Sequence, residues 1–268
     1  MSQIFPYMNQ LRFRRYGVEI DYVDNLPALD YMKPRINYER DILPADYYPI
    51  YQAGKEISLQ ISLNTTKVRS AAIFSNGILL YHTSIVAADT FATNINQTIN
   101  QTGIYYYIIT LKIDNVNTTF ISDEFKVVEW ADKKDLVKFT YSDTNNDNGG
   151  RFYNSSGDLI WNPSVYYTGT LGEDKTQYDS SVFTSQQNNL QVIRRTPRLV
   201  NKVLISCIQR CYYANLSFQL TCNNIYVNNV KYAVESVGKF DPKGDKTDVG
   251  DVEIIISRNT NNNYQQFL

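Results

Sequence analysis

The chain has little of what enzymes use for chemistry. Its 268 residues include one histidine, His82, and three cysteines, and no glycine-rich phosphate-binding loop. A catalytic triad needs a histidine beside a nucleophile and a third residue that orients the ring, and a lone histidine after an apolar run does not supply this. The sequence therefore predicts a protein that is not an enzyme, with no catalytic, cofactor-binding or metal-binding residue.

Charge and hydropathy exclude further classes. Lys and Arg total 26 and Asp and Glu total 27, which gives a net charge of −1. The chain has no basic stripe of the kind that binds nucleic acid, and no window of about 20 apolar residues that could span a membrane. The first ten residues lack the charged and apolar regions of a signal peptide, so we expect synthesis in the cytoplasm.

Cysteine usage fits a reducing compartment. Cys207, Cys211 and Cys222 are interpreted as small buried apolar residues, and a disulfide between two of them is the alternative, which a reducing cytoplasm disfavours. The Asn- and Thr-rich composition produces glycosylation sequons by chance, and without secretion they are not glycan sites. The sequons are Asn64, Asn96, Asn100, Asn117, Asn154 and Asn215.

What the chain does contain is β-strand sequence. Hydrophobic residues make up 43% of it, including 22 tyrosines. Residues 57–63 alternate strictly between apolar and polar, which indicates a half-buried strand, and Asn76-Gly77 between two apolar runs predicts a hairpin. Long strands are also expected at 104–113 and 120–130. The spacing predicts an immunoglobulin- or fibronectin-III-like β-sandwich over residues 49–130.

A run of tyrosines supports this interpretation. Gly103-Ile104-Tyr105-Tyr106-Tyr107 comes at the start of the penultimate expected strand. Sandwiches of this class place a tyrosine corner there, in which a tyrosine hydroxyl bonds to the backbone a few residues upstream. The pattern therefore predicts such a corner in this chain.

Residues 1–48 do not have the pattern of a compact domain. Prolines recur through the segment at Pro6, Pro27, Pro34 and Pro44, and they interrupt helices and strand ladders. Many apolar and aromatic residues lie between them, so we expect an extended N-terminal arm that lies on the chain's own second domain or on a neighbouring chain. Apolar alternation around Tyr16-Gly17 favours a hairpin within it.

Residues 131–268 are predicted to form a second β-rich domain, which begins at the charged joint 131–135. The fold class is therefore all-β, with two tandem β-sandwich-like domains, the first immunoglobulin- or fibronectin-III-like, preceded by the extended N-terminal arm. The expected elements of the second domain are strands at 136–141 and 165–171, apolar runs at 190–193 and 199–208 split by Pro197, a short helix at 212–220, a hairpin at 225–232 tipped by Asn228-Asn229, a strand at 252–257 and a polar C-terminal tail at 258–268.

Two oxygen-rich segments were candidates for a cation. Asp143-Thr-Asn145-Asn-Asp147 begins like a calcium loop, but the sixth and twelfth positions are Asn148 and Asn154 where an EF-hand requires Gly and Glu. An Asx-rich turn is the preferred interpretation. The second segment interleaves aspartates with lysines that would neutralise them, so it is expected to be a surface loop. Its aspartates are Asp241, Asp245, Asp248 and Asp251.

The order of motifs resembles a known group of proteins. The chain carries Phe139-x-Tyr141-Ser142, then Thr176-x-Tyr178, then Thr196-Pro197-Arg198, and later a hairpin and a terminal Val-Glu-Ile-Ile-Ile strand. From Pro49 onward this is similar to tail-associated structural proteins (tail, neck or baseplate) of phages and prophages of Bacteroidetes-type bacteria. This chain departs from that pattern at Asn228-Asn229, where the group usually has Asp-Gly. The resemblance implies a virion component that is made in the host bacterial cytoplasm, with no catalytic residue to carry over.

Two functions follow as hypotheses. The first is a structural adaptor in the phage tail, neck or baseplate that forms a symmetric multi-copy ring through its arm and β-domains. Its partners would be copies of itself and neighbouring virion proteins. The second is a carbohydrate-binding or host-adhesion module, in which Trp161, Tyr166 and Tyr167 would stack on sugar rings. Separately, the cluster of Arg194, Arg195 and Arg198 is either a site for an anion or a partner carboxylate or, as we prefer, a solvated strand edge.

Overall fold

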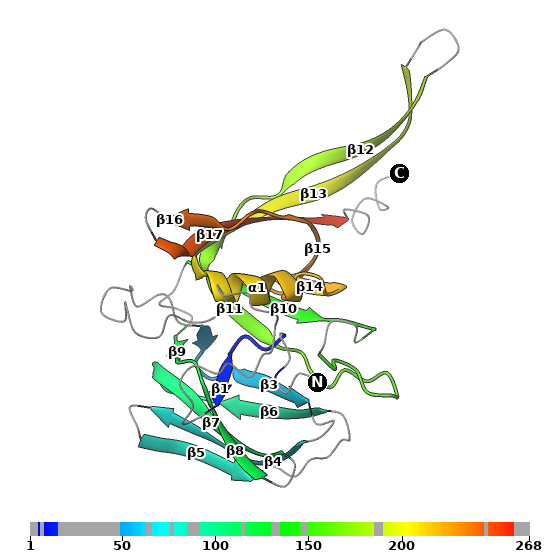
Figure 1. The fold of residues 1–268 in the computed structure, drawn as a ribbon. Coiled ribbons are helices and arrows are strands. Elements are labelled where there is room, and N and C mark those ends of the chain that lie inside the picture. The colour runs from blue at the N-terminus through cyan, green and yellow to red at the C-terminus, as the bar shows by residue number, and fades with distance from the viewer. Residues whose placement is uncertain are drawn as a thin grey trace.

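The protein is all-β (Figure 1). The structure, a computed structural model, describes residues 5, 8–15, 49–62, 66–75, 78–84, 92–113, 116–129, 135–145, 150–184, 190–243 and 246–259. Within this part of the chain one helix accompanies the strands, and the strands fall into two units stacked one above the other in Figure 1.

The first unit consists of two facing sheets. Its strands are β1 (Phe13–Arg15), β2 (Ile50–Gln52), β3 (Glu56–Ser62), β4 (Thr66–Ser75), β5 (Ile78–Ser84), β6 (Ala92–Thr98), β7 (Gly103–Ile113), β8 (Val116–Ser122) and β9 (Phe125–Val128). One sheet has the order β5-β4-β7-β8-β1, and the other pairs β3 with β6. The apolar residues of β3, at Ile57, Leu59 and Ile61, are buried against the larger sheet, which confirms the predicted apolar face; Gln60 on the other face is buried too, and Leu63 lies outside the described residues.

Two expectations for this unit can be compared directly with the strand pairings. β4 and β5 form the expected hairpin, with Ser75 opposite Ile78, while the Asn76-Gly77 turn itself lies outside the described residues. The single strand expected at 120–130 is wrong, because the chain breaks after Ser122 into β8 and β9. The Asp123 N–H still donates to the carbonyl of Arg12 at 2.9 Å, next to the Phe13–Ser122 pair, and after it the chain changes partners, because β9 pairs with β7 and β2.

The second unit closes on itself. Its elements are β10 (Leu136–Ser142), β11 (Ser164–Leu171), β12 (Lys175–Thr184), β13 (Leu190–Gln209), α1 (Arg210–Gln219), β14 (Asn224–Val227), β15 (Val230–Val237), β16 (Asp241–Lys243) and β17 (Lys246–Asn259). The pairing runs β11-β10-β14-β15-β17-β13 and returns from β13 to β11, which is a six-stranded barrel. The strand pairings therefore give a barrel where the sequence predicted two facing sheets.

Closure of the barrel depends on one strand with two neighbours. β11 pairs with β10 through residues 164–168 and with β13 through residues 169–171. At the switch, a Cβ on Gly169 would lie 2.2 Å from the Leu204 carbonyl oxygen, so only glycine permits this approach. Alternate residues of the barrel strands fill the interior, as expected for a small barrel. Tyr212 and Leu216 of α1, and Leu220 at its C-terminal cap, join that core.

Pro197 lies inside a single strand, although the sequence predicted that it splits two apolar runs. The Gly172 N–H donates to the Lys202 carbonyl at 2.9 Å. In this part of β13 the backbone N–H and C=O groups of even-numbered residues are therefore directed toward β12, and those of odd-numbered residues toward β17. β17 has already ended at this level, since its last pairing is Asn259 with Arg198. The N–H that proline lacks would therefore have no partner in β17.

The N-terminal segment belongs to both cores. Phe5, Leu11 and Phe13 are buried in the first unit, whereas Met8, which is fully buried, packs in the second. β1 extends the larger sheet by pairing with β8. Of the predicted arm, these described residues lie on the chain's own body; the rest, including the hairpin expected around Tyr16-Gly17, lies outside the described residues.

Candidate assembly surfaces

The two units share a strand. Ile50 in β2 pairs in parallel with Lys126 of β9 and antiparallel with Tyr166 of β11. Ile50 and Tyr166 pack with Val128 and Leu136 in a small apolar cluster at this point. The backbone ladder therefore continues from the first unit into the barrel.

Buried amides tie the same junction together. Asn9 Nδ2 donates to the Gln60 carbonyl at 2.7 Å, and the Gln60 N–H donates to Asn9 Oδ1 at 2.9 Å. The Gln60 side chain then donates to the Arg151 carbonyl at 2.8 Å and accepts from the Arg151 N–H at 2.6 Å. Asn94 Nδ2 donates to the Ile160 carbonyl at 2.8 Å. Paired amides in a buried setting fix orientation, because leaving any one of them unpaired is costly.

A charged group completes the contact. Arg12 Nη2 donates to Asp123 Oδ2 at 2.8 Å, and the hydroxyl of Tyr212 donates to the same oxygen at 2.8 Å. The Arg12 guanidinium carbon lies 5.0 Å from the centre of the Tyr212 ring. Residues of the N-terminal segment, the first unit and α1 therefore meet at one carboxylate.

One cavity lies beside this junction, between the N-terminal segment, β11, β13 and α1. Its volume is about 30 Å³, and Gln10, Ile50, Tyr166 and Tyr212 are among its walls. This volume accommodates one or two water molecules. It is too small for a substrate or a sugar.

The second feature is a two-stranded ribbon, defined here as residues 175–184 of β12 and 190–200 of β13. It projects well beyond the barrel in Figure 1. Among the described residues, β17 accompanies β13 only from Arg198 onward, and no third strand pairs with residues 179–184 or 190–196. A two-stranded ribbon is marginally stable by itself in water, which makes this projection a candidate contact surface.

The aromatic residues expected to stack on sugars are not available for that role. Trp161, Tyr166 and Tyr167 are 1%, 3% and 7% exposed, so the prediction for these residues is wrong. The Trp161 ring stacks on Phe152 with centroids 5.0 Å apart, and the Tyr167 hydroxyl donates to Gln219 Oε1 at 2.9 Å. Trp161 and Tyr167 pack in the barrel core, and Tyr166 packs in the apolar cluster at the junction.

The two oxygen-rich segments have local partners. Asp143 Oδ1 accepts from the Asn145 N–H at 3.3 Å, which is an Asx turn, and residues 146–149 lie outside the described residues. The second segment was expected to be a loop, and this is wrong: Asp241 in β16 lies opposite Asp251 in β17. The carboxylate of Asp251 accepts from the Cys207 N–H at 2.9 Å, because Cys207 sits in a bulge of β13 with a φ of +56°.

The remaining candidates are spread through the fold. His82 pairs with Ala72 through the β4–β5 ladder, and its side chain lies outside the described part. Arg198 forms an ion pair with Glu235, and the side chains of Arg194 and Arg195 lie outside the described part. Cys222 is a buried thiol in the barrel core, and Cys207 is a half-buried thiol on a different element.

Comparisons of this chain with protein-family models, with curated proteins and with solved structures give no match. Among the described residues, no helix is both long and apolar enough to cross a membrane. The function is therefore inferred from the geometry of the junction and the ribbon.

Proposed function

We propose that this protein is a non-enzymatic structural component of a bacteriophage virion, an adaptor of the tail, neck or baseplate that assembles into a symmetric multi-copy ring. The observation that carries the proposal is the ribbon of β12 and β13. In the described part of the chain, the outer half of this ribbon has no third strand beside it, and an unpaired strand edge is a liability for an isolated protein. In an assembly, a neighbouring subunit can cover this strand edge.

The fixed junction between the units supports the same function. An adaptor must hold its contact surfaces at defined angles, since symmetric assemblies close only when each interface repeats the same rotation. The shared strand β2 and the carboxylate of Asp123 join the two units without a flexible linker among the described residues. The ribbon is then presented at a fixed orientation relative to the first unit.

We also propose that the first unit is an immunoglobulin- or fibronectin-III-like sandwich. Its larger sheet has the order β5-β4-β7-β8, and β3 pairs with β6 in the other sheet. This matches the C′-C-F-G and B-E pairings of that class. The Tyr105 hydroxyl donates to the Gln101 carbonyl at 2.8 Å, which is the bond expected of a tyrosine corner. Domains of this class serve as spacers and adhesive modules on many surfaces.

The carbohydrate-binding alternative has less support. Its three proposed stacking residues are buried, and the cavity at the junction is too small for a sugar ring. Glycan binding is retained only as an outcome of the experiment.

The proposal is tested on particles and on the purified chain. Virions purified from the source culture are separated into capsid and tail fractions, and peptides of this chain are sought by mass spectrometry. The purified full-length chain is then imaged, and its mass in solution is measured, alone and with co-expressed virion neighbours. Recovery in tail fractions and ring-shaped oligomers are expected. A chain absent from particles, monomeric with every virion protein tested, and bound by a glycan array would overturn the proposal in favour of adhesion.

A further inference from the structure

We propose that the outer edge of β12 binds the β12 edge of a second copy, so that the two strands pair antiparallel about a two-fold axis. This inference depends on the proposed function only in that the chain associates with itself. It adds the partner, the strand and the register of one contact.

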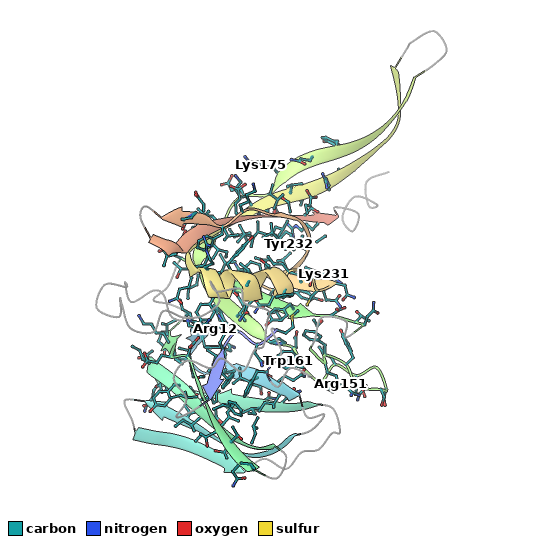
Figure 2. The ribbon with its side chains drawn as sticks, viewed as in Figure 1. Arg12, Arg151, Trp161, Lys175, Lys231 and Tyr232 are labelled. Atoms are coloured by element: carbon teal, nitrogen blue, oxygen red, sulfur yellow. The ribbon has the colours of Figure 1, made fainter. Side chains whose placement is uncertain are left out.

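The edge of β12 is open along its first half. In the part of the chain that the structure describes, β12 pairs with β13 alone and forms one end of the large sheet. Residues 173–178 are all exposed, and Tyr178 is 62% exposed. Lys175 lies near the base of the ribbon in Figure 2. Exposure of consecutive residues means that neither face of the strand is covered here.

The backbone of this edge has its hydrogen-bonding groups directed outward at alternate residues. Because even-numbered residues of β13 point toward β12, Arg198 and Val200 bond to their register partners Gln177 and Lys175. The N–H and C=O groups of Thr176 and Tyr178 therefore point away from β13. Pro197, the register partner of Tyr178, agrees with this, since proline could not complete a hydrogen-bonded pair there.

Few of the usual devices protect this edge. β12 contains no proline, and its only irregularity comes after Ser181, beyond the exposed stretch. Proteins commonly blunt an edge with proline, an early bulge or repeated charges. Between Lys175 and Ser181 the charged residues are Lys175 and Asp179, which have opposite signs and are four residues apart.

That spacing makes the edge complementary to itself. In an antiparallel pair centred on Gln177, Thr176 of one copy forms a hydrogen-bonded pair with Tyr178 of the other, and Lys175 lies opposite Asp179 on both sides of the axis. Centring on Asp179 would place two aspartates opposite one another, and centring on Thr176 would place Glu173 opposite Asp179. Charge complementarity therefore selects the second copy as occupant and Gln177 as the centre.

A two-fold contact has a consequence for the assembly. It joins subunits in pairs, and pairs arranged about an axis by another interface give a ring with dihedral symmetry. The copy number of the assembly is then even.

The experiment compares two substitutions at one position, with mass in solution measured against concentration. Tyr178→Pro removes the outward N–H and leaves the bonds to β13 intact, whereas Tyr178→Thr keeps the N–H and removes the same ring. We expect the wild-type chain and Tyr178→Thr to associate, and Tyr178→Pro to weaken association about tenfold or more. Circular dichroism confirms that both variants remain folded.

A charge exchange tests the register independently of proline. Lys175→Glu alone and Asp179→Lys alone place like charges opposite one another and should weaken association, while the double variant restores opposite charges and should recover it. Folded Tyr178→Pro with unchanged mass, or a double variant no better than either single one, overturns the inference. If the wild type still forms rings in that case, the proposed function stands and only the β12 contact is wrong. If the β12 contact forms a pair that never builds a larger assembly, the inference stands and the proposed ring is wrong.

Discussion

The hydroxyl of Tyr212 on α1 donates a hydrogen bond to the carboxylate of Asp123 in the first unit, across 2.8 Å. The same carboxylate oxygen accepts from Arg12, whose side chain is 9% exposed. We expect Tyr212→Phe to lower the free energy of unfolding by about 1.5 kcal/mol. Asp123→Ala should lower it by about 3 kcal/mol, because it leaves a nearly buried guanidinium without this carboxylate.

The double variant distinguishes a shared network from two separate contacts. Since both hydrogen bonds end on one carboxylate, Asp123→Ala with Tyr212→Phe should cost less than the two single effects added together. Urea unfolding provides the measurement, and Tyr226→Phe, a half-buried tyrosine on β14, is the matched control. Strict additivity would contradict the network.

Met8 provides a test of the N-terminal segment. It is fully buried in the barrel core although it precedes the first unit in sequence. We expect Met8→Ala to destabilise the chain by about 3 kcal/mol, and Met8→Leu, which conserves volume, by less than about 1.5 kcal/mol. A variant that starts at Asp46 also loses Phe5, Leu11 and Phe13 from the first core. If its thermal unfolding midpoint equals that of the full chain, the segment is dispensable and this prediction is wrong.

Two tyrosines on β7 should respond in opposite directions. Tyr105→Phe removes the hydrogen bond to the Gln101 carbonyl and should cost about 1 kcal/mol. The Tyr107 hydroxyl is buried and, among the described residues, has no hydrogen-bond partner. Tyr107→Phe should therefore stabilise the chain by about 1 kcal/mol. Chemical denaturation of both variants measures the difference, and equal losses would show that the Tyr107 hydroxyl is satisfied.

Alkaline pH should unfold this protein through its buried tyrosines. Burial raises the pKa of Tyr51, Tyr107, Tyr141 and Tyr167 above the ordinary tyrosine value, which is about 10. The neutral hydroxyls are therefore favoured in the folded state, and the stability they contribute is complete below about pH 10. As pH rises above that value the unfolded chain ionises first, so the free energy of unfolding falls. The free energy of unfolding, measured by chemical denaturation at a series of pH values above about 10, should fall less steeply with pH for Tyr107→Phe than for the wild type.

Short-range patterns predicted most of the strands. The apolar face of β3 at Ile57, Leu59 and Ile61, the helix near 212–220 and the Asn228-Asn229 hairpin are confirmed, the last with φ of +48° and +69° at its two tip residues. These features depend on a few neighbouring side chains and on which residues tolerate a positive φ. They are visible in sequence because their causes are local.

The barrel and the ribbon were harder to foresee for a physical reason. Barrel closure depends on β11 meeting β13 some 35 residues later, at Gly169 and Ile205, and no local pattern encodes that pairing. Lys175–Thr184 is polar at most positions, so hydropathy does not mark it as a strand. Pro197 suggests the end of a strand in the sequence, because the pairing of β17 with β13 stops at Arg198 and this cannot be known from local residues. The double role of residues 5–15 likewise appears only when both cores exist.

The junction illustrates the same limit. Asn9, Gln60 and Asp123 are common surface residue types, and nothing in their spacing predicts that Asn9 and Gln60 are buried as a pair or that Asp123 is paired with Arg12. Their partners come from segments far apart in the chain. The predicted sugar-stacking role of Trp161 and Tyr166 is wrong because aromatic residues suit both a sugar-binding surface and a core, and only burial in the fold distinguishes the two.

The length of β13 has a mechanical consequence. Its 20 residues form one side of the ribbon and then continue as a strand of the barrel, with a bulge at Cys207. A pull applied at the far end of the ribbon therefore enters the barrel along the strand axis, where many backbone hydrogen bonds are sheared together. Peeling would break them one at a time and requires far less force. We therefore expect a load on the ribbon to reach the barrel through β13 without first peeling its strand pairs apart.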